Sequence, residues 1–195
     1  MSLRVSGGRR LRSPKGDLAR PTSSRVRLAV INLLAPRLAG ARWLDLCCGS
    51  GAMACEALQH GVADVVGVER DRSVVAVARA NLEAVRGGLA GERGGPGPAV
   101  RVDCEEVLRW LGRTCTAPFD LIYADPPYAA GLYTPIATAV LRGGWLCPGG
   151  ILVWECASDA VPVLPPGWQC RDQRRYGGST VVLLEMVLLE TVAQP

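Results

Sequence analysis

The residue types best suited to chemistry stand together in the sequence FDLIYADPPY, residues 119–128. Its first half is apolar and β-prone, which predicts a buried strand over 119–123. The two prolines end this strand, because proline has no N–H for a sheet and restricts the residue before it. Asp125 is therefore expected at the carboxyl end of a strand, the edge where open α/β sheets bind ligands.

The tetrapeptide Asp125-Pro126-Pro127-Tyr128 is suited to holding an aromatic amine. The Asp125 carboxylate and the Pro126 carbonyl can each accept one hydrogen of an amino group. The Tyr128 ring offers a surface on which an aromatic base can stack. An amine held this way has its lone pair drawn out of conjugation and aimed at an electrophile. The alternative is an ordinary Asp-Pro turn, but the preceding apolar strand and the following tyrosine favour a site.

A glycine-rich turn forms a second motif. The run Gly49-Ser50-Gly51-Ala52-Met53-Ala54 matches G-x-G-x-x-G/A between a predicted strand (43–48) and a predicted helix (52–59), and Glu69 follows Gly49 by 20 residues. This spacing satisfies the dinucleotide-binding fingerprint, so an NAD(P)-dependent oxidoreductase is one candidate. The glycines would let the backbone approach a ligand closely, and Glu69 would take ribose hydroxyls.

Acidic residues near this turn favour a different ligand. Asp45 lies in the preceding strand, where it would repel the pyrophosphate that otherwise binds at a helix N-terminus. It would suit the cationic amino-acid end of S-adenosylmethionine. Asp103 ends the predicted strand at 100–102 and could accept from an adenine amino group. The motif D-L-C-C-G-S-G with acids ending two further strands therefore favours S-adenosylmethionine over a dinucleotide.

Predicted strands and helices alternate along the chain. This order indicates an α/β fold with a mainly parallel sheet, helices on both faces, and one antiparallel strand contributed by a final hairpin. A short strand or hairpin is expected near 3–5 and 9–11, and a mobile Gly/Pro-rich loop over 87–98. The other predicted helices span 24–34, 71–86, 104–111 and 132–141; a further strand spans 150–156, and the final hairpin pairs 168–176 with 180–186.

Composition indicates one intracellular globular domain. The 195 residues are 49% hydrophobic, with neither a signal-peptide pattern nor a run of membrane-spanning length, so we expect a soluble cytoplasmic protein. The eight cysteines contain no C-x-x-C pair, which favours free core thiols over a zinc site. His60 is expected on the surface at the end of a helix.

Positive charge is concentrated at the N-terminus. Residues 1–42 carry ten basic side chains and one acid, a net charge of +9, and the remainder carries −5. This asymmetry predicts a basic arm and helix over 1–42, packed on a core domain over 43–195, that binds a polyanion. Arginine supplies 21 of the 22 basic residues, and its planar fork suits phosphate.

D-L-C-C-G-S-G followed by D-P-P-Y resembles the class I S-adenosylmethionine-dependent amino-methyltransferases. Further motifs resemble the RsmD-type enzymes, which methylate the N2 amine of one guanine in bacterial 16S (small-subunit) ribosomal RNA. The resemblance extends over about residues 3–185, with Leu28 where the family usually has glutamate. The motifs are G-G at 7–8, R-P-T at 20–22, V-R at 26–27, N-x-L at 32–34, E-A-L at 56–58 and H-G-V-A at 60–63.

The resemblance implies a seven-stranded Rossmann-like sheet and a role for each matching residue. Asp45, Gly49 and Gly51 would bind the methionine part of S-adenosylmethionine, Glu69 the ribose, and Asp103 with the Cys104 backbone the adenine. Asp125, Pro126, Pro127 and Tyr128 would hold the guanine, and RNA phosphates would meet Arg9, Arg10, Arg20, Thr22 and Arg25.

The implied partner is 16S ribosomal RNA, within a small-subunit particle, and a monomer is the default expectation. D-P-P-Y is shared with DNA adenine-N6 methyltransferases, which therefore stay an alternative, although the chain shows no target-recognition domain. A non-catalytic RNA-binding protein is a third possibility, which an activity assay would exclude.

Overall fold

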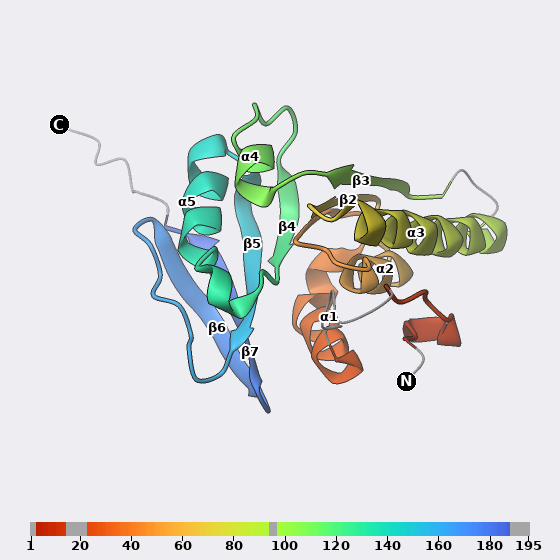
Figure 1. Cartoon of the computed structure of the whole chain (residues 1–195), viewed down its shortest axis with the longest axis horizontal. Coiled ribbons are helices and arrows are strands. Elements are labelled where there is room, and N and C mark those ends of the chain that lie inside the picture. Colours follow the sequence, from red (N-terminus) through yellow and green to blue (C-terminus); the bar gives the residue numbers. More distant parts are fainter. Residues whose placement is uncertain (1–2, 15–22, 94–96, 188–195) are drawn as a thin grey trace.

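A seven-stranded sheet forms the centre of the computed structural model, which describes residues 3–14, 23–93 and 97–187. Its strand order is β3-β2-β1-β4-β5-β7-β6 (Figure 1). The strands are β1 (Arg42–Leu46), β2 (Asp64–Glu69), β3 (Ala99–Cys104), β4 (Phe119–Ala124), β5 (Leu146–Ala157), β6 (Trp168–Tyr176) and β7 (Ser179–Met186). The helices are η1 (Ser6–Gly8), α1 (Ser24–Leu38), α2 (Ala52–Gln59), α3 (Arg72–Arg93), α4 (Val107–Leu111), η2 (Tyr128–Ala130) and α5 (Tyr133–Gly143).

Strand directions confirm the predicted fold class. Strands β1 to β5 pair in parallel, whereas β7 is antiparallel to both β5 and β6. Among the described strands, β7 is therefore the one that runs against the others. In the register of β1 and β4, Asp45 lies beside Tyr123 and Leu46 beside Ala124. The carboxyl ends of β1, β2, β4 and β5 consequently meet at one edge of the sheet.

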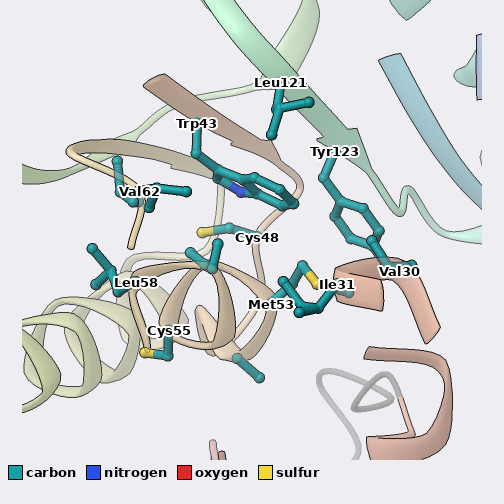
Figure 2. Close-up of a cluster of buried hydrophobic side chains, with 14 of the residues drawn as sticks. Val30, Ile31, Trp43, Cys48, Met53, Cys55, Leu58, Val62, Leu121 and Tyr123 are labelled. Carbon is teal, nitrogen blue, oxygen red and sulfur yellow. The ribbon is translucent and has the colours of Figure 1, made fainter. Parts of the chain in front are cut away.

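Helices cover both faces of the sheet, as predicted. Helices α1, α2 and α3 lie on one face and α4 and α5 on the other (Figure 1). Because side chains alternate along a strand, Trp43 and Tyr123 point to the face of the sheet that α1, α2 and α3 cover, and both lie in the hydrophobic core on that face. Their ring centroids are 6.2 Å apart, and Figure 2 shows these rings above α2, with Val30 and Ile31 of α1 and Met53 of α2 beside them.

A buried ion pair attaches the N-terminal segment to the core. Arg27 of α1 and Glu56 of α2 are each 1% exposed, and Arg27 Nε lies 3.7 Å from Glu56 Oε2. Arg27 Nη2 donates to the Arg4 carbonyl at 2.6 Å, and Glu56 Oε1 accepts from the Ser6 N–H at 3.0 Å. The Arg4–Arg10 antiparallel bridge confirms the short hairpin expected there. The charge pair thus fixes this hairpin against α1 and α2.

The predicted loop over 87–98 is wrong for its first part, because α3 continues to Arg93. The three glycines of α3, Gly87, Gly88 and Gly91, each cost about 1 kcal/mol relative to alanine. Leu89 is 4% exposed and follows buried Val85 by one helical turn, so burial of its side chain offsets part of this cost. Gly88 also lies directly against the Arg9 guanidinium, which would have to shift to make room for a Cβ at this position.

His60 caps the C-terminal end of α2 and is exposed, as predicted. The eight cysteines are free thiols. Across the described ranges, no three His, Cys, Asp or Glu side chains are grouped to hold a metal ion. No helix within those ranges has both the length and the apolar character needed to cross a bilayer.

Candidate active site

A cavity of about 550 Å³ opens at the carboxyl edge of the sheet. It brings the two sequence motifs together, because the glycine turn after β1 and the D-P-P-Y turn after β4 both line it. Acids follow the sheet order β2-β1-β4-β5 across this edge, and neighbouring strands are about 4.8 Å apart. These acids are Glu69, Asp45, Asp125 and Glu155.

The glycine turn has a sharply bent backbone. Cys47 adopts φ 60°, a left-handed conformation that is uncommon for a residue with a side chain. Gly51 adopts φ 73°, and a Cβ there would lie 3.4 Å from the Ala78 Cβ of α3. Helix α2 begins immediately afterwards at Ala52. The turn therefore brings the start of α2 close to the cavity while α3 packs behind it.

Asp45 is buried, with 1% of its surface exposed, and its Oδ2 accepts from the Ala54 N–H of α2 at 3.1 Å. Burial raises the pKa of the Asp45 carboxyl well above its usual value. The Ala54 hydrogen bond opposes this rise in pKa, whereas the nearby charges of Asp125 and Glu69 add to it. The three carboxylates thus repel one another, and a cation placed among them would relieve that repulsion.

Cys47 and Cys48 follow Asp45 in the same turn. Burial raises the pKa of Cys47 to about 12, and the charges of Glu69, Asp45 and Asp125 contribute to the rise. Burial also raises the pKa of Cys48 well above its usual value. Both side chains stay protonated at neutral pH, so neither supplies a thiolate nucleophile to the cavity.

Glu69 ends β2 and is held by two main-chain donors. Its Oε2 accepts from the Gly49 N–H at 3.1 Å, and its Oε1 accepts from the Asp71 N–H at 3.0 Å. Asp71 in turn accepts from the N–H groups of Ser73 and Val74 at the start of α3. The Glu69 carboxylate is therefore fixed in orientation between the glycine turn and α3.

The D-P-P-Y turn leaves the sheet directly after β4. The Asp125 N–H lies 3.5 Å from the Leu46 carbonyl, so the turn stays beside the end of β1. Pro126 is buried, whereas Pro127 and Tyr128 are exposed. Tyr128 begins the short helix η2 and is 40% exposed. An aromatic ring at the mouth of a cavity can stack on a planar ligand.

Tyr133 of α5 links the D-P-P-Y turn to β5. Its hydroxyl donates to the Glu155 carbonyl at 2.6 Å and lies 3.4 Å from the Pro126 carbonyl. Burial raises the pKa of Tyr133, and the Asp125 charge acts in the same direction. Tyr133 therefore remains a hydrogen-bond donor. Its role depends on a tertiary contact, which the sequence pattern of its own helix does not indicate.

The cavity lining includes Asp45, Gly49, Glu69 and the four D-P-P-Y residues, but not Gly51, Asp103 or Cys104. Asp103 Oδ2 instead accepts from Trp110 Nε1 at 2.7 Å, and its Oδ1 lies 3.3 Å from Arg101 Nε. Strand β3 extends to Cys104, so the following residues, Glu105 and Glu106, reach the cavity in their place. Sequence reasoning missed these two acids because it ended the strand too early.

The predicted RNA-binding residues have different surroundings. Arg10 and Arg25 are exposed. Arg9 is partly buried and donates to the Ala84 carbonyl of α3 at 2.7 Å, so it attaches the N-terminal segment to the core. Arg20 and Thr22 lie outside the described residues.

The strand order and the cavity at its carboxyl edge place the chain in the class of Rossmann-like methyltransferase folds. A solved structure of the Escherichia coli protein yhhF, classed provisionally as a methyltransferase, superposes with a TM-score of 0.79. It is 27% identical, and the match covers 95% of this chain and 98% of that one.

The chain belongs to the family described as conserved hypothetical protein 95, whose model matches residues 4–185. It is 30% identical over 180 residues to ribosomal RNA small subunit methyltransferase D of Escherichia coli K12, covering 90% of this chain and 85% of the relative. The Haemophilus influenzae protein of the same name is 26% identical over 171 residues, and this match covers 87% of this chain and 84% of that relative. The predicted resemblance to RsmD-type enzymes is thereby confirmed.

Proposed function

We propose that this protein transfers a methyl group from S-adenosylmethionine to the exocyclic N2 amine of a specific guanine in 16S ribosomal RNA. One observation carries the proposal: the acid-flanked glycine turn and the D-P-P-Y turn open onto a single cavity. The names and nearly full-length match of the curated relatives support small-subunit ribosomal RNA as the acceptor. We place the reaction in the cytoplasm, on a small-subunit particle, with the protein acting as a monomer.

The residues around the glycine turn fit S-adenosylmethionine better than a dinucleotide. Burial is the main cause of the raised pKa of Asp45, and the charges of Asp125 and Glu69 add to it. These three neighbouring acids favour a cationic ligand and oppose a pyrophosphate. Asp45, Gly49 and Gly51 would face the methionine part, and Glu69 the ribose hydroxyls. When bound, S-adenosylmethionine supplies an electrophilic methyl group on a positively charged sulfur.

At the adenine end, our proposal differs from the assignment expected from the sequence. We propose that Glu105 and Glu106, which line the cavity, take the adenine contacts expected from Asp103 and Cys104. The Glu106 side chain caps α4 through the Arg109 N–H at 2.9 Å, so its orientation is fixed. Glu105 follows β3 directly, and its N–H donates to the Glu69 carbonyl at 2.9 Å.

The D-P-P-Y residues would prepare the amine for transfer. The Asp125 carboxylate and Pro126 carbonyl accept its two hydrogens, Tyr128 stacks on the base, and Pro127 fixes the turn. Tyr133 holds this turn against β5. The protein's contribution to the rate is then mainly positioning. A paired guanine cannot reach the cavity, so the base must be unpaired or flipped out of its helix.

Changing Glu69 to glutamine tests the cofactor assignment. Because a hydrogen bond to a charged group is worth about 1.5–3 kcal/mol, we expect the KM for S-adenosylmethionine to rise by about 10- to 100-fold, with kcat much less affected. Glu83→Gln is the matched control, since Glu83 lies on the surface of α3 with its side chain 53% exposed. Steady-state kinetics with varied S-adenosylmethionine would measure both; an unchanged KM in Glu69→Gln would contradict the assignment.

The basic segment 1–42 is proposed to bind RNA phosphates, with residues 43–195 as the catalytic domain. Replacing Arg10 and Arg25, the two predicted RNA-binding arginines that are exposed, with alanine should weaken RNA binding and flatten its salt dependence. The slope of log K against log salt should fall by about 0.7 for each phosphate of single-stranded RNA that the variant no longer neutralises. Arg142→Ala is the control, because Arg142 is an exposed residue near the end of α5. Filter binding from low to moderate salt would measure the slopes, and equal slopes for all variants would contradict this role.

Transfer of labelled methyl to a panel of acceptors tests the function as a whole. The panel contains small ribosomal subunits lacking the modification, large subunits, duplex DNA and total protein. Label in the RNA of small subunits is the expected result. Label in DNA would favour the adenine-N6 alternative, and binding of NAD but not S-adenosylhomocysteine, measured by calorimetry, would favour the oxidoreductase alternative.

A further inference from the structure

Glu155 is a buried carboxylate that has no role in the proposed binding of S-adenosylmethionine or of the guanine amine. It lies near the end of β5, is 3% exposed and lines the same cavity as the D-P-P-Y turn. The Tyr123 hydroxyl donates to its Oε2 at 2.5 Å. Burying a carboxylate is unfavourable unless its oxygens accept hydrogen bonds. Such a group in a binding cavity is well placed to accept from a ligand N–H, since each carboxylate oxygen can accept more than one hydrogen bond.

Glu155 lies on the base-binding side of the cavity. Because β5 follows β4 in the sheet order, Glu155 flanks Asp125 on the side away from β1 and Glu69. Tyr133 contacts both the Glu155 carbonyl and the Pro126 carbonyl. The charges of Asp125 and Glu155 both act on the Tyr133 hydroxyl, which agrees with this placement.

D-P-P-Y alone does not choose between bases, because adenine and guanine both present an aromatic amine. The atom beside that amine differs. Guanine carries an N1–H donor next to its N2 amine, whereas the N1 of adenine beside the N6 amine is an acceptor. A carboxylate only accepts hydrogen bonds when ionised. It therefore complements the guanine edge and repels the corresponding edge of adenine.

We propose that Glu155 accepts a hydrogen bond from N1–H of the target guanine while Asp125 and Pro126 hold the N2 amine. Glu155 is then the residue that selects guanine over adenine. Tyr123 orients the carboxylate for this contact. The inference rests on the proposed function, because it requires a guanine in the cavity.

The test compares guanine with 2-aminopurine at the modified position of small-subunit RNA assembled into particles. 2-Aminopurine keeps the N2 amine but has an acceptor at N1. Wild type should methylate guanine with a kcat/KM at least about tenfold higher than 2-aminopurine, since a site built for a donor rejects an analogue lacking it. Glu155→Gln should lower kcat/KM for guanine and bring this ratio toward one, because its amide can donate to N1 of 2-aminopurine.

Glu185→Gln on the adjacent strand β7 is the matched control, because Glu185 pairs with Arg171 at the surface and should leave the ratio unchanged. An equal loss for both bases in Glu155→Gln would show a merely structural role and overturn the inference. If Glu155→Gln does not fold, the ratio of kcat/KM for guanine to that for 2-aminopurine would be measured for wild type and for Tyr123→Phe, which lacks the hydroxyl that orients Glu155. A wild-type ratio near one would also overturn the inference. Absence of N2 methylation on guanine by wild type would refute the proposed function itself.

Discussion

Replacing Asp125 with asparagine is expected to lower kcat for methyl transfer by about 10²–10³-fold, the usual cost of losing one preorganised electrostatic contact in an active site. Asparagine is nearly isosteric, but its side chain is uncharged and places a donor where the carboxylate offers an acceptor. The amine lone pair is then less well localised and less well aimed. Because Asp125 lines the cavity beside the buried Asp45, removing its charge also relieves repulsion, so folding should be preserved.

Single-turnover kinetics with saturating S-adenosylmethionine would isolate this effect from cofactor binding. Asp159→Asn is the matched control, because Asp159 is exposed in the connection after β5 and does not line the cavity. Thermal unfolding of both variants would confirm that they fold. Near-wild-type turnover by Asp125→Asn would exclude the proposed mechanism of amine activation.

Replacing Glu56 with alanine is expected to lower the free energy of unfolding by about 3–5 kcal/mol, since it leaves a buried charge without its partner. Arg27 is 1% exposed, and its Nε lies 3.7 Å from Glu56 Oε2. The substitution also removes the acceptor of the Ser6 N–H. The N-terminal hairpin should therefore detach from α2, and RNA binding should weaken with it.

Urea unfolding, monitored by tryptophan fluorescence, would measure the change in the free energy of unfolding. Glu83→Ala removes an exposed ion pair with Arg86 in α3 and should cost only about 0.3–0.5 kcal/mol. A double variant, Arg27→Met with Glu56→Leu, should recover much of the lost stability, because apolar side chains of similar volume can replace a buried pair. Equal losses in the free energy of unfolding for Glu56→Ala and Glu83→Ala would contradict this role of the buried Arg27–Glu56 pair.

Most of the fold could be predicted because local patterns agree with the final packing. The apolar residues from Trp43 to Leu46 predict a strand that is covered on both faces. The glycines after this strand predict a turn. The prolines at 126 and 127 set the end of β4 by covalent geometry. These signals depend on nearby residues alone, so the sheet edge and its two motifs could be placed without the structure.

The remaining features depend on contacts between distant parts of the chain. Helix α3 passes Gly87 because Leu89 is buried against the core, which no local propensity indicates. Asp103 accepts a hydrogen bond from Trp110, and the acids that line the cavity at this point are Glu105 and Glu106. Glu155 shares the cavity with Asp125 because β5 pairs with β4, and this pairing is a property of the assembled sheet.

Nucleoside analysis of the methylated product would identify the base and the atom that receive the methyl group. Small subunits lacking the modification would be incubated with the protein and labelled S-adenosylmethionine, and their RNA digested to nucleosides. We expect the label to be recovered as N2-methylguanosine from one position. Recovery as N6-methyladenosine would still agree with a D-P-P-Y turn that holds an aromatic amine. It would contradict guanine N2 as the atom that receives the methyl group.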